Sequence, residues 1–273
     1  MNTTNLQQQN NETKDAWNAM AHLWDERMGD EGNDFHRLLV WPSTERLLRL
    51  KDNTRVLDIA CGTGLTSKRL AALGAKVLAV DFAREMIEKA KARTHRYSQR
   101  VEYRVLDATD EKALNELESN RFDVAICAMG LMDMVNLKPL MKFLAKVLSP
   151  SGDFIFSVMH PCFNSMHVKM VAELDDRNGQ LVTEYALKIS NYLESTVRQG
   201  LAFDGQPKPH LFFHRPLHIL LGEAFDVGFM LDKIEEPSFP SDYLSGNSPL
   251  SWGANFHQFP PVLVGRLRLI KSM

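Results

Sequence analysis

A strand, a glycine turn and a helix follow one another over residues 56–74, and this succession constrains the fold most. Residues 56–60 (VLDIA) have the composition of a buried strand, and residues 61–64 (CGTG) form a tight turn. Apolar residues then recur at helical spacing over 65–73, and Gly74 follows as a helix C-cap. Glycines let the backbone approach a ligand, and the helix start offers it unpaired N–H groups. The segment predicts the first half of a ligand-binding βαβ unit.

The next strand distinguishes between two classes of nucleotide site. Residues 76–81 (KVLAVD) predict a strand that ends in Asp81, about 19 positions after Gly62, where a Rossmann-type site binds ribose hydroxyls. The dinucleotide fingerprint G-x-G-x-x-G needs a third glycine, and Ser67 occupies that position. The pattern therefore fits a nicotinamide or flavin enzyme poorly.

These residues resemble the first motif of the class I S-adenosylmethionine (SAM)-dependent methyltransferases, D/E-x-G-x-G-x-G after a strand. Asp58, Gly62 and Gly64 match it, and Ala60 replaces the first glycine. The resemblance implies an α/β fold with a Rossmann-like, doubly wound seven-stranded sheet and an antiparallel last strand. It also implies SAM as cofactor and S-adenosylhomocysteine as product.

Hydrophobic patterns further along the chain fit that fold. After the first two strands we expect strands at 101–106, 122–130, 153–159, 231–237 and 262–270, and helices at 82–90, 137–148 and 216–229. The segment 122–130 is nearly all apolar, as a central parallel strand is. In the resembling family the last two strands close the sheet as an antiparallel hairpin.

We interpret the chain as a flexible tail, 1–14, followed by a single SAM-binding methyltransferase domain, 15–273. The tail is rich in Asn, Gln and Thr. After Asp15, apolar residues at helical spacing predict an N-terminal helical cap, in which Trp17 and Trp24 either pack in the core or form a lid over the cofactor. A polar connecting loop, 29–36, and a further helix from about 42 to 50 precede the first strand.

Residues 160–213 interrupt the alternation of strands and helices. They are polar, with turn signals at 175–179 and 203–207, and residues 182–189 have the composition of a strand. Loops carry specificity on rigid α/β scaffolds. We therefore interpret this insertion after the fifth strand as an acceptor-binding lid.

The resemblance assigns cofactor contacts to the carboxyl ends of the first four strands. Asp81 binds the ribose, and Phe82 and Met86 pack on the adenine, although Met86 also fits a core position. Asp107 binds the adenine amine or, alternatively, caps the following helix, as Thr109 also could. The expected cofactor-binding residues are Asp58, Ala60, Cys61, Gly62, Thr63, Gly64, Asp81, Phe82, Met86, Asp107, Ala108, Ala128, Met129 and Gly130.

Methyl transfer from a sulfonium is an in-line displacement, for which the protein chiefly positions the acceptor and excludes water. Orientation supplies about 7–11 kcal/mol, and a general base adds about 10²–10⁴-fold when the acceptor loses a proton. His160 is the candidate base because it ends the fifth strand, and the alternative is a structural histidine. Asp133, Tyr192 and His214 are the expected substrate-binding residues.

Several acceptors and cofactors are disfavoured by the motifs. Enzymes that methylate exocyclic amines of adenine or cytosine carry Asn/Asp-Pro-Pro-aromatic after the fourth strand, where residues 128–131 read AMGL. The Pro161-Cys162 pair follows the fifth strand, unlike the nucleophile of cytosine C5 enzymes, which follows the fourth, so we interpret Cys162 as an ordinary buried thiol. The sequence has no HxH, CxxC or carboxylate cluster, so no metal is expected.

Composition bounds the partners. A net charge of −2 without a dense basic block argues against nucleic acid. Three scattered cysteines, no signal peptide and no long apolar run predict a cytoplasmic protein without a membrane partner. We expect it to be a monomer or a homodimer.

The sequence therefore predicts an enzyme, a SAM-dependent methyltransferase acting on a small-molecule acceptor. The alternatives are a non-catalytic SAM-binding regulatory or partner protein, an NAD-dependent oxidoreductase, and a SAM enzyme that does not transfer methyl. An open acceptor cavity bearing His160 favours the enzyme, and a cavity filled by side chains favours the binder. The acceptor and its reacting atom (O, N, C or S) stay open.

Overall fold

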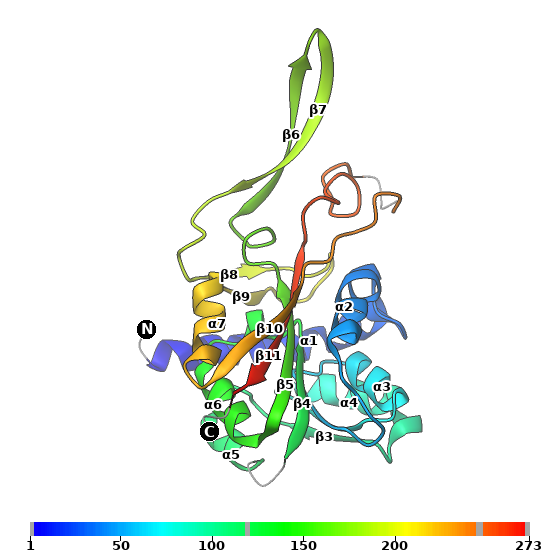
Figure 1. Cartoon of the computed structure of the whole chain (residues 1–273), viewed down its shortest axis with the longest axis vertical. Coiled ribbons are helices and arrows are strands. Elements are labelled where there is room, and N and C mark those ends of the chain that lie inside the picture. Colours follow the sequence, from blue (N-terminus) through cyan, green and yellow to red (C-terminus); the bar gives the residue numbers. More distant parts are fainter. Residues whose placement is uncertain (1–2, 118–120, 244–247, 271–273) are drawn as a thin grey trace.

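The computed structural model describes residues 3–117, 121–243 and 248–270, and a seven-stranded sheet forms its centre (Figure 1). The strands lie in the order β10-β11-β5-β4-β1-β2-β3. Their bounds are β1 Arg55–Ile59, β2 Lys76–Asp81, β3 Val101–Val105, β4 Phe122–Ala128, β5 Leu148–Met159, β10 Phe229–Glu235 and β11 Val262–Leu269. Each corresponds to a strand predicted from the sequence.

Strand directions confirm the predicted fold class. The strands β1 to β5 run parallel to their neighbours, β11 runs antiparallel to β5, and β10 runs antiparallel to β11. The strand order reverses between β1 and β4, which places a crevice beyond the carboxyl ends of these two strands.

Helices cover both faces of the sheet and enclose two hydrophobic cores. One core contains apolar side chains of α5 (Glu111–Asn115), α6 (Lys138–Val147) and α7 (Leu217–Phe225). The other contains those of η1 (Phe35–Val40), α2 (Trp41–Leu47), α3 (Leu65–Ala72) and α4 (Arg84–Arg93). Central strands contribute to both cores by alternation: in β5, Phe154 and Phe156 face the first core and Ile155 the second. Short turns η2 (His95–Tyr97) and η3 (Leu131–Asp133) complete the core domain.

The N-terminal segment differs from the sequence-based expectation. From Thr3 the expected tail is the first part of one long helix, α1 (Thr3–Met28). Asn10 and Thr13 are buried, and Ala21 packs against Ala83 and Met86. Polar composition predicted mobility, but contacts with distant parts of the chain hold these residues in place.

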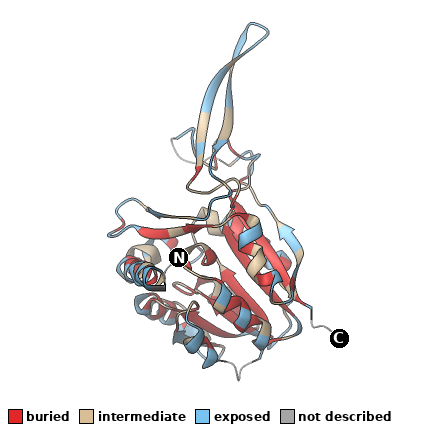
Figure 2. Cartoon of the chain, turned by 90° about the vertical axis from the view of Figure 1, so that its left-hand side faces the viewer, coloured by how far each residue is buried: buried red, intermediate tan, exposed pale blue. Residues whose placement is uncertain are grey.

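The insertion after β5 consists of two hairpins. The strands β6 (Val168–Arg177) and β7 (Gln180–Ile189) form a long ribbon that projects from the body and is mainly exposed or half-buried (Figures 1 and 2). The strands β8 (Thr196–Gly200) and β9 (His210–His214) form the second hairpin, which lies against the body. The strand expected at 182–189 is part of β7.

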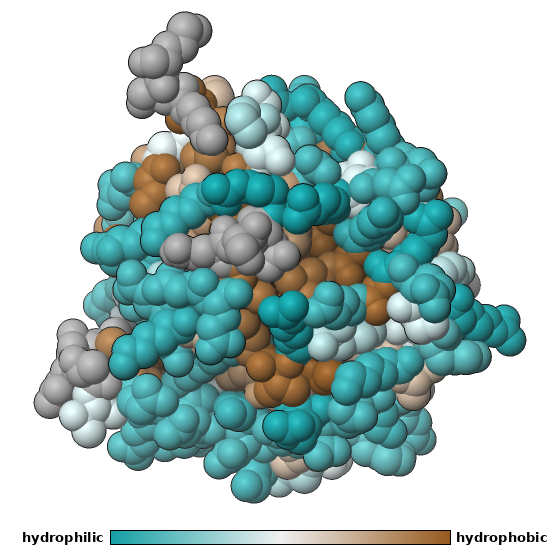
Figure 3. Space-filling view, turned by 90° about the horizontal axis from the view of Figure 1, so that it is seen from below, coloured by the Kyte–Doolittle hydropathy of each residue, from teal (hydrophilic) through white to brown (hydrophobic). Residues whose placement is uncertain are grey.

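The surface at the end of the molecule opposite the ribbon is mainly hydrophilic, with a smaller hydrophobic area within it (Figure 3). Within the described residues, no helix combines the length and the apolar composition that crossing a membrane requires.

Candidate functional site

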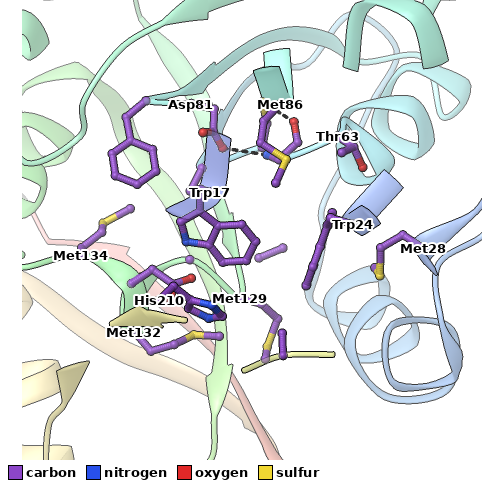
Figure 4. A pocket seen from close by; sticks show the side chains of 18 of the residues that line it. Trp17, Trp24, Met28, Thr63, Asp81, Met86, Met129, Met132, Met134 and His210 are labelled. Atoms are coloured by element: carbon purple, nitrogen blue, oxygen red, sulfur yellow. Dashed lines mark hydrogen bonds between the residues drawn. The ribbon is translucent and has the colours of Figure 1, made fainter. Parts of the chain in front are cut away.

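A cavity of about 530 Å³ lies at the crevice where the strand order reverses. Its walls come from the glycine turn after β1, the ends of β2 and β4, the segment after β3, helix α1 and strand β9. Figure 4 shows Trp17 between Asp81 and Met86 on one side and Met129 and His210 on the other. The site thus combines the sheet edge with segments far away in the sequence.

The glycine turn has the conformation that its sequence requires. Ala60, Gly62 and Gly64 all have positive φ, at 53°, 54° and 79°. A Cβ on Gly64 would lie 2.9 Å from the Cβ of Ala90, so this position has no room for a side chain. A Cβ on Gly62 would meet nothing within 4 Å, and Gly62 lines the cavity. The turn therefore exposes its backbone to a ligand.

Asp81 at the end of β2 holds this turn in place. Its Oδ2 accepts a hydrogen bond from Gly62 N–H at 2.9 Å, and its Oδ1 accepts from Ala83 N–H at 2.9 Å (Figure 4). Burial raises the pKa of Asp81 to about 6, while the two backbone N–H groups oppose that shift. The carboxylate keeps lone pairs for a further donor in the cavity.

Ser67 occupies the third fingerprint position for a structural reason. Its hydroxyl donates to Asp58 Oδ2 at 2.5 Å, and both residues are buried. Asp58 Oδ1 is buried without a hydrogen-bond partner among the described residues. Burial raises the pKa of Asp58 to about 7. A cationic ligand group beside this carboxyl would favour its ionised form.

Asp107, which follows β3, accepts hydrogen bonds both from a residue close in sequence and from helix α1. Its Oδ1 accepts from the N–H of Thr109 at 2.8 Å, and its Oδ2 accepts from Asn10 Nδ2 at 2.5 Å. Asp110, not Asp107 or Thr109, caps α5 by accepting from Lys112 N–H at 2.9 Å. The capping alternative for Asp107 is therefore wrong.

One face of α1 covers the cavity. Asn10, Trp17 and Trp24 line it at intervals of seven residues, which places them along one side of a helix. Asp25 pairs with the buried guanidinium of Arg93 in α4 and so anchors α1. Both tryptophans line the cavity and also pack against the cluster of Ala21, Ala83 and Met86.

The far end of the cavity is aromatic and contains His210 of β9. Its ring packs 4.8 Å from Trp17 and 4.3 Å from Phe212, measured between centroids. Gln206 Oε1 accepts from Ala202 N–H, so the amide Nε2 of Gln206 donates to His210 Nδ1 at 3.0 Å. The proton of the neutral ring is therefore on Nε2, and burial lowers the pKa of His210 to about 4.

Three buried acidic or polar groups of the site have unused hydrogen-bonding capacity. Asp133 Oδ1 is buried without a partner among the described residues, and burial raises the pKa of this carboxyl well above its usual value. Thr63 Oγ1 and Asn10 Oδ1 are likewise buried without partners in the described structure. All three residues line the cavity.

This pattern fits SAM. Buried polar atoms in folded proteins nearly always have partners, and SAM offers an amine, two hydroxyls and an ammonium group to them. Asp81, Asp107 and Asn10 line the cavity and can meet such groups, whereas Asp58 lies outside its lining. No group of three metal-ligating side chains occurs in the part of the chain that the structure describes.

Comparison with known proteins relates part of this chain to a methyltransferase domain. The model of the family described as "Methyltransferase domain" matches residues 56–152. A putative S-adenosylmethionine-dependent methyltransferase from Listeria monocytogenes superposes with a TM-score of 0.60 at 20% identity, over 85% of this chain and 98% of that one. A Mesorhizobium loti SAM-dependent methyltransferase gives 0.63 at 21%, over 84% and 96%. Residues 56–152 therefore match a methyltransferase domain, and the fold of the chain resembles that of solved SAM-dependent methyltransferases.

Curated relatives resemble part of the chain. The ubiquinone biosynthesis O-methyltransferase of Xanthomonas oryzae pv. oryzae (strain PXO99A) is 33% identical over 106 residues, 39% of this chain and 43% of the relative. That of Xanthomonas euvesicatoria is 30% identical over 150 residues, 54% of this chain and 60% of the relative. The chain thus spans about half the length of the curated relatives it matches.

The structure brings most of the predicted cofactor-binding residues together around the cavity. The residues that line the cavity are Ala60, Cys61, Gly62, Thr63, Asp81, Phe82, Met86, Asp107, Ala108, Ala128, Met129 and Gly130. Asp58 lies behind the glycine turn, and Gly64 begins α3. Met129 has a positive φ of 58° and donates its N–H to Ser157.

His160 does not occupy the position expected for a base. Its Nδ1 accepts from Cys162 N–H at 3.1 Å, and its Nε2 donates to Glu236 Oε1 at 2.9 Å. Met159 lines the cavity, and His160 lies outside that lining, because successive strand residues point to opposite sides. Both ring nitrogens are occupied, which corrects the candidate base to a structural histidine.

Tyr192 and His214 connect the insertion to the core rather than line the cavity. His214 Nε2 lies 2.8 Å from the carbonyl oxygen of Tyr192, and the Tyr192 hydroxyl accepts from Leu217 N–H at 2.9 Å. Of the three substrate-binding candidates, the structure brings Asp133 to the cavity and leaves these two outside its lining.

Sequence reasoning missed Asn10, His36 and His210. Asn10 has a detectable signal, its spacing of seven from Trp17 and Trp24. His36 lies in the expected surface loop but lines the cavity, and burial with the nearby Arg69 charge lowers its pKa to about 4. His210 is part of no motif, and only the folding of β9 against α1 brings it to the site.

Proposed function

We propose that this chain binds SAM in the cavity and transfers its methyl group to a small-molecule acceptor, releasing S-adenosylhomocysteine. One observation carries the proposal. The cavity does not end at the residues suited to SAM but continues to His210, Asp133 and Phe212. An open extension of this kind suits an enzyme, whereas a regulatory binder needs no acceptor space.

The protein's part in the reaction is positioning. The ribose hydroxyls donate to Asp81, the glycine turn receives the amino-acid part, and Phe82 with Met86 forms the apolar surface for the adenine. SAM supplies the activated methyl group. The aromatic walls of α1 and β9 exclude water, which strengthens electrostatic interactions in the site.

The acceptor end suits an oxygen nucleophile. The His210 Nε2–H is a donor at neutral pH, so it can hydrogen-bond an oxygen lone pair but not an ammonium group. In the proposed step the acceptor oxygen forms a bond to the methyl carbon and the carbon–sulfur bond breaks, its electron pair remaining on sulfur. The hydroxyl proton passes to Asp133, whose ionised form the nearby sulfonium charge stabilises. The relatives named as O-methyltransferases support this choice of atom.

The test is isothermal titration of the purified protein with SAM, S-adenosylhomocysteine and NADH, followed by an acceptor screen. We expect micromolar binding of both adenosyl compounds and none of NADH. Methyl-labelled SAM should then label small aromatic hydroxyl compounds in preference to matched amines. Binding of NADH alone would overturn the cofactor assignment, and labelling of the amines alone would overturn the oxygen acceptor.

A further inference from the structure

The ribbon β6–β7 has two chemically different faces. Opposite residues of an antiparallel pair point to the same side, so Met170 with Leu187 and Leu174 with Thr183 share one, mainly apolar face. Leu174 and Leu181 at its outer part are 74% and 70% exposed. Only the inner part is covered, where the Tyr185 ring lies 5.9 Å from that of Phe256. Isolated two-stranded ribbons are marginally stable in water.

The other face carries like charges directly opposite one another. Lys169 pairs with Lys188, and Glu173 pairs with Glu184. Like charges in opposite positions destabilise a ribbon. Of the four, Glu184 alone has an ion pair among the described residues, with Arg177 at 3.3 Å. Within one chain this arrangement is unfavourable. Along β6, however, the lysine and the glutamate are placed symmetrically, because Val171 lies midway between Lys169 and Glu173.

The backbone of β6 is free to pair along its outer edge. The turn Asn178-Gly179 has positive φ at both residues, 59° and 81°, which is the two-residue hairpin turn that makes Arg177 and Gln180 a hydrogen-bonded pair. Odd-numbered residues of β6 therefore bond to β7, and even-numbered residues direct N–H and C=O outward. Among the described strands, β6 pairs with β7 alone.

We propose that β6 pairs antiparallel with β6 of a second copy of this chain, about a two-fold axis at Val171. In this register Met170 faces Ala172 and Val168 faces Leu174, all even-numbered positions with outward backbone groups. Lys169 of each copy then faces Glu173 of the other in non-hydrogen-bonded pairs, where side chains approach most closely. The result is a four-stranded sheet in which the unfavourable charges find opposite partners.

The same register brings the exposed apolar tip of each ribbon beside the base of the other. Leu174 lies three residues from the axis at Val171, next to Val168 of the second copy, and the inner part of that copy's ribbon carries the contact between Tyr185 and Phe256. Lysines on edge strands usually prevent pairing. Here each lysine meets a glutamate, so the same residues permit one register and disfavour others.

Charge exchange tests the interface in the full chain. We expect wild-type protein to sediment at twice the mass of one chain, and K169E and E173K each to weaken the dimer about ten-fold or more, since the like-charge contact recurs on both sides of the axis. An equimolar mixture of K169E and E173K should restore the double mass, because each altered position then faces an opposite charge.

A matched control is K188E, the same charge change directly across the ribbon on β7, which should leave the mass of the dimer unchanged. Circular dichroism and SAM titration of each variant verify that the fold is kept. A monomeric wild type, equal effects of K169E and K188E, or failure of the mixture to form a dimer would each overturn the proposal. None of these outcomes depends on methyl transfer.

Discussion

At the scale of single residues, two glycines in the turn after β1 have different roles: Gly64 allows close packing, and Gly62 lines the cavity. Gly62 has open space where a Cβ would be, whereas a Cβ on Gly64 would lie within 2.9 Å of Ala90. Both have positive φ, so alanine costs about 1–2 kcal/mol of backbone strain at either position. The additional steric cost falls on Gly64 alone.

We therefore expect Gly62→Ala to abolish SAM binding while lowering the free energy of unfolding only by the strain. Gly64→Ala should destabilise the fold further, because α3 and α4 must move apart. Thermal unfolding and titration with SAM, performed on both variants, check this. Equal losses of stability in the two variants would contradict the distinction.

Asn10 gives a second prediction at this scale. Its amide nitrogen holds Asp107, and its Oδ1 is buried without a partner among the described residues. Asn10→Ala should weaken SAM and adenosine equally, by up to about ten-fold, as expected for one or two hydrogen bonds of roughly 0.5–1.5 kcal/mol. The control is Asn11→Ala, at an exposed neighbouring position. Unchanged adenosine binding in Asn10→Ala would exclude an adenine contact.

Among the elements, α1 has the greatest influence on access to the site. It lies along the cavity from Asn10 at Asp107 to Trp24, and it is held on α4 by Asp25. A ligand enclosed under this helix can leave only if the helix moves, so bound ligand should hold α1 in place.

Proteolysis measures that effect. We expect saturating S-adenosylhomocysteine to slow trypsin cleavage at Lys14 and Arg27, both within α1, more than cleavage at Arg177 in the exposed ribbon. Cleavage at Lys14 that is insensitive to the ligand would show that α1 does not close on the cofactor.

For the whole molecule, the buried acids and histidines make stability and binding depend on pH. The pKa values of Asp58 and Asp81 are raised to about 7 and 6, so the folded state holds protons that the unfolded state releases near 3.8. These two groups lower stability as pH rises from about 4 to 7. The pKa values of His36 and His210 are lowered to about 4, so these groups lower stability as pH falls from about 6.5 to 4.

The raised pKa values predict the direction in which SAM affinity changes with pH. SAM is cationic at its sulfonium and favours the ionised acids, so its affinity should rise between pH 5.5 and 7.5 with release of protons. Titrations in buffers of different ionisation enthalpy measure the protons released. Asp58→Asn should reduce the release, and a flat affinity profile in the wild type would contradict the linkage.

The sequence by itself determined the sheet, its last antiparallel strand and the cofactor side of the cavity. The reason is local: strand, glycine turn and terminal carboxylate are adjacent in the chain, and parallel strands bring their carboxyl ends to one edge. The spacing placed Asp81 and Gly62 at the same edge of the sheet, and their hydrogen bond shows that they lie together.

Only the tertiary structure decided the acceptor side. His160 and Met159 are neighbours in sequence, but strand alternation directs them to different surroundings, and a position at a strand end does not reveal which residue faces the cavity. Asn10 lies 97 residues before Asp107 in the sequence, and His210 lies in β9, far beyond β5. Only the fold brings the two residues to the site. Polar composition suggested a mobile tail and a surface loop, because composition does not reveal which polar residues are buried by distant elements of the fold.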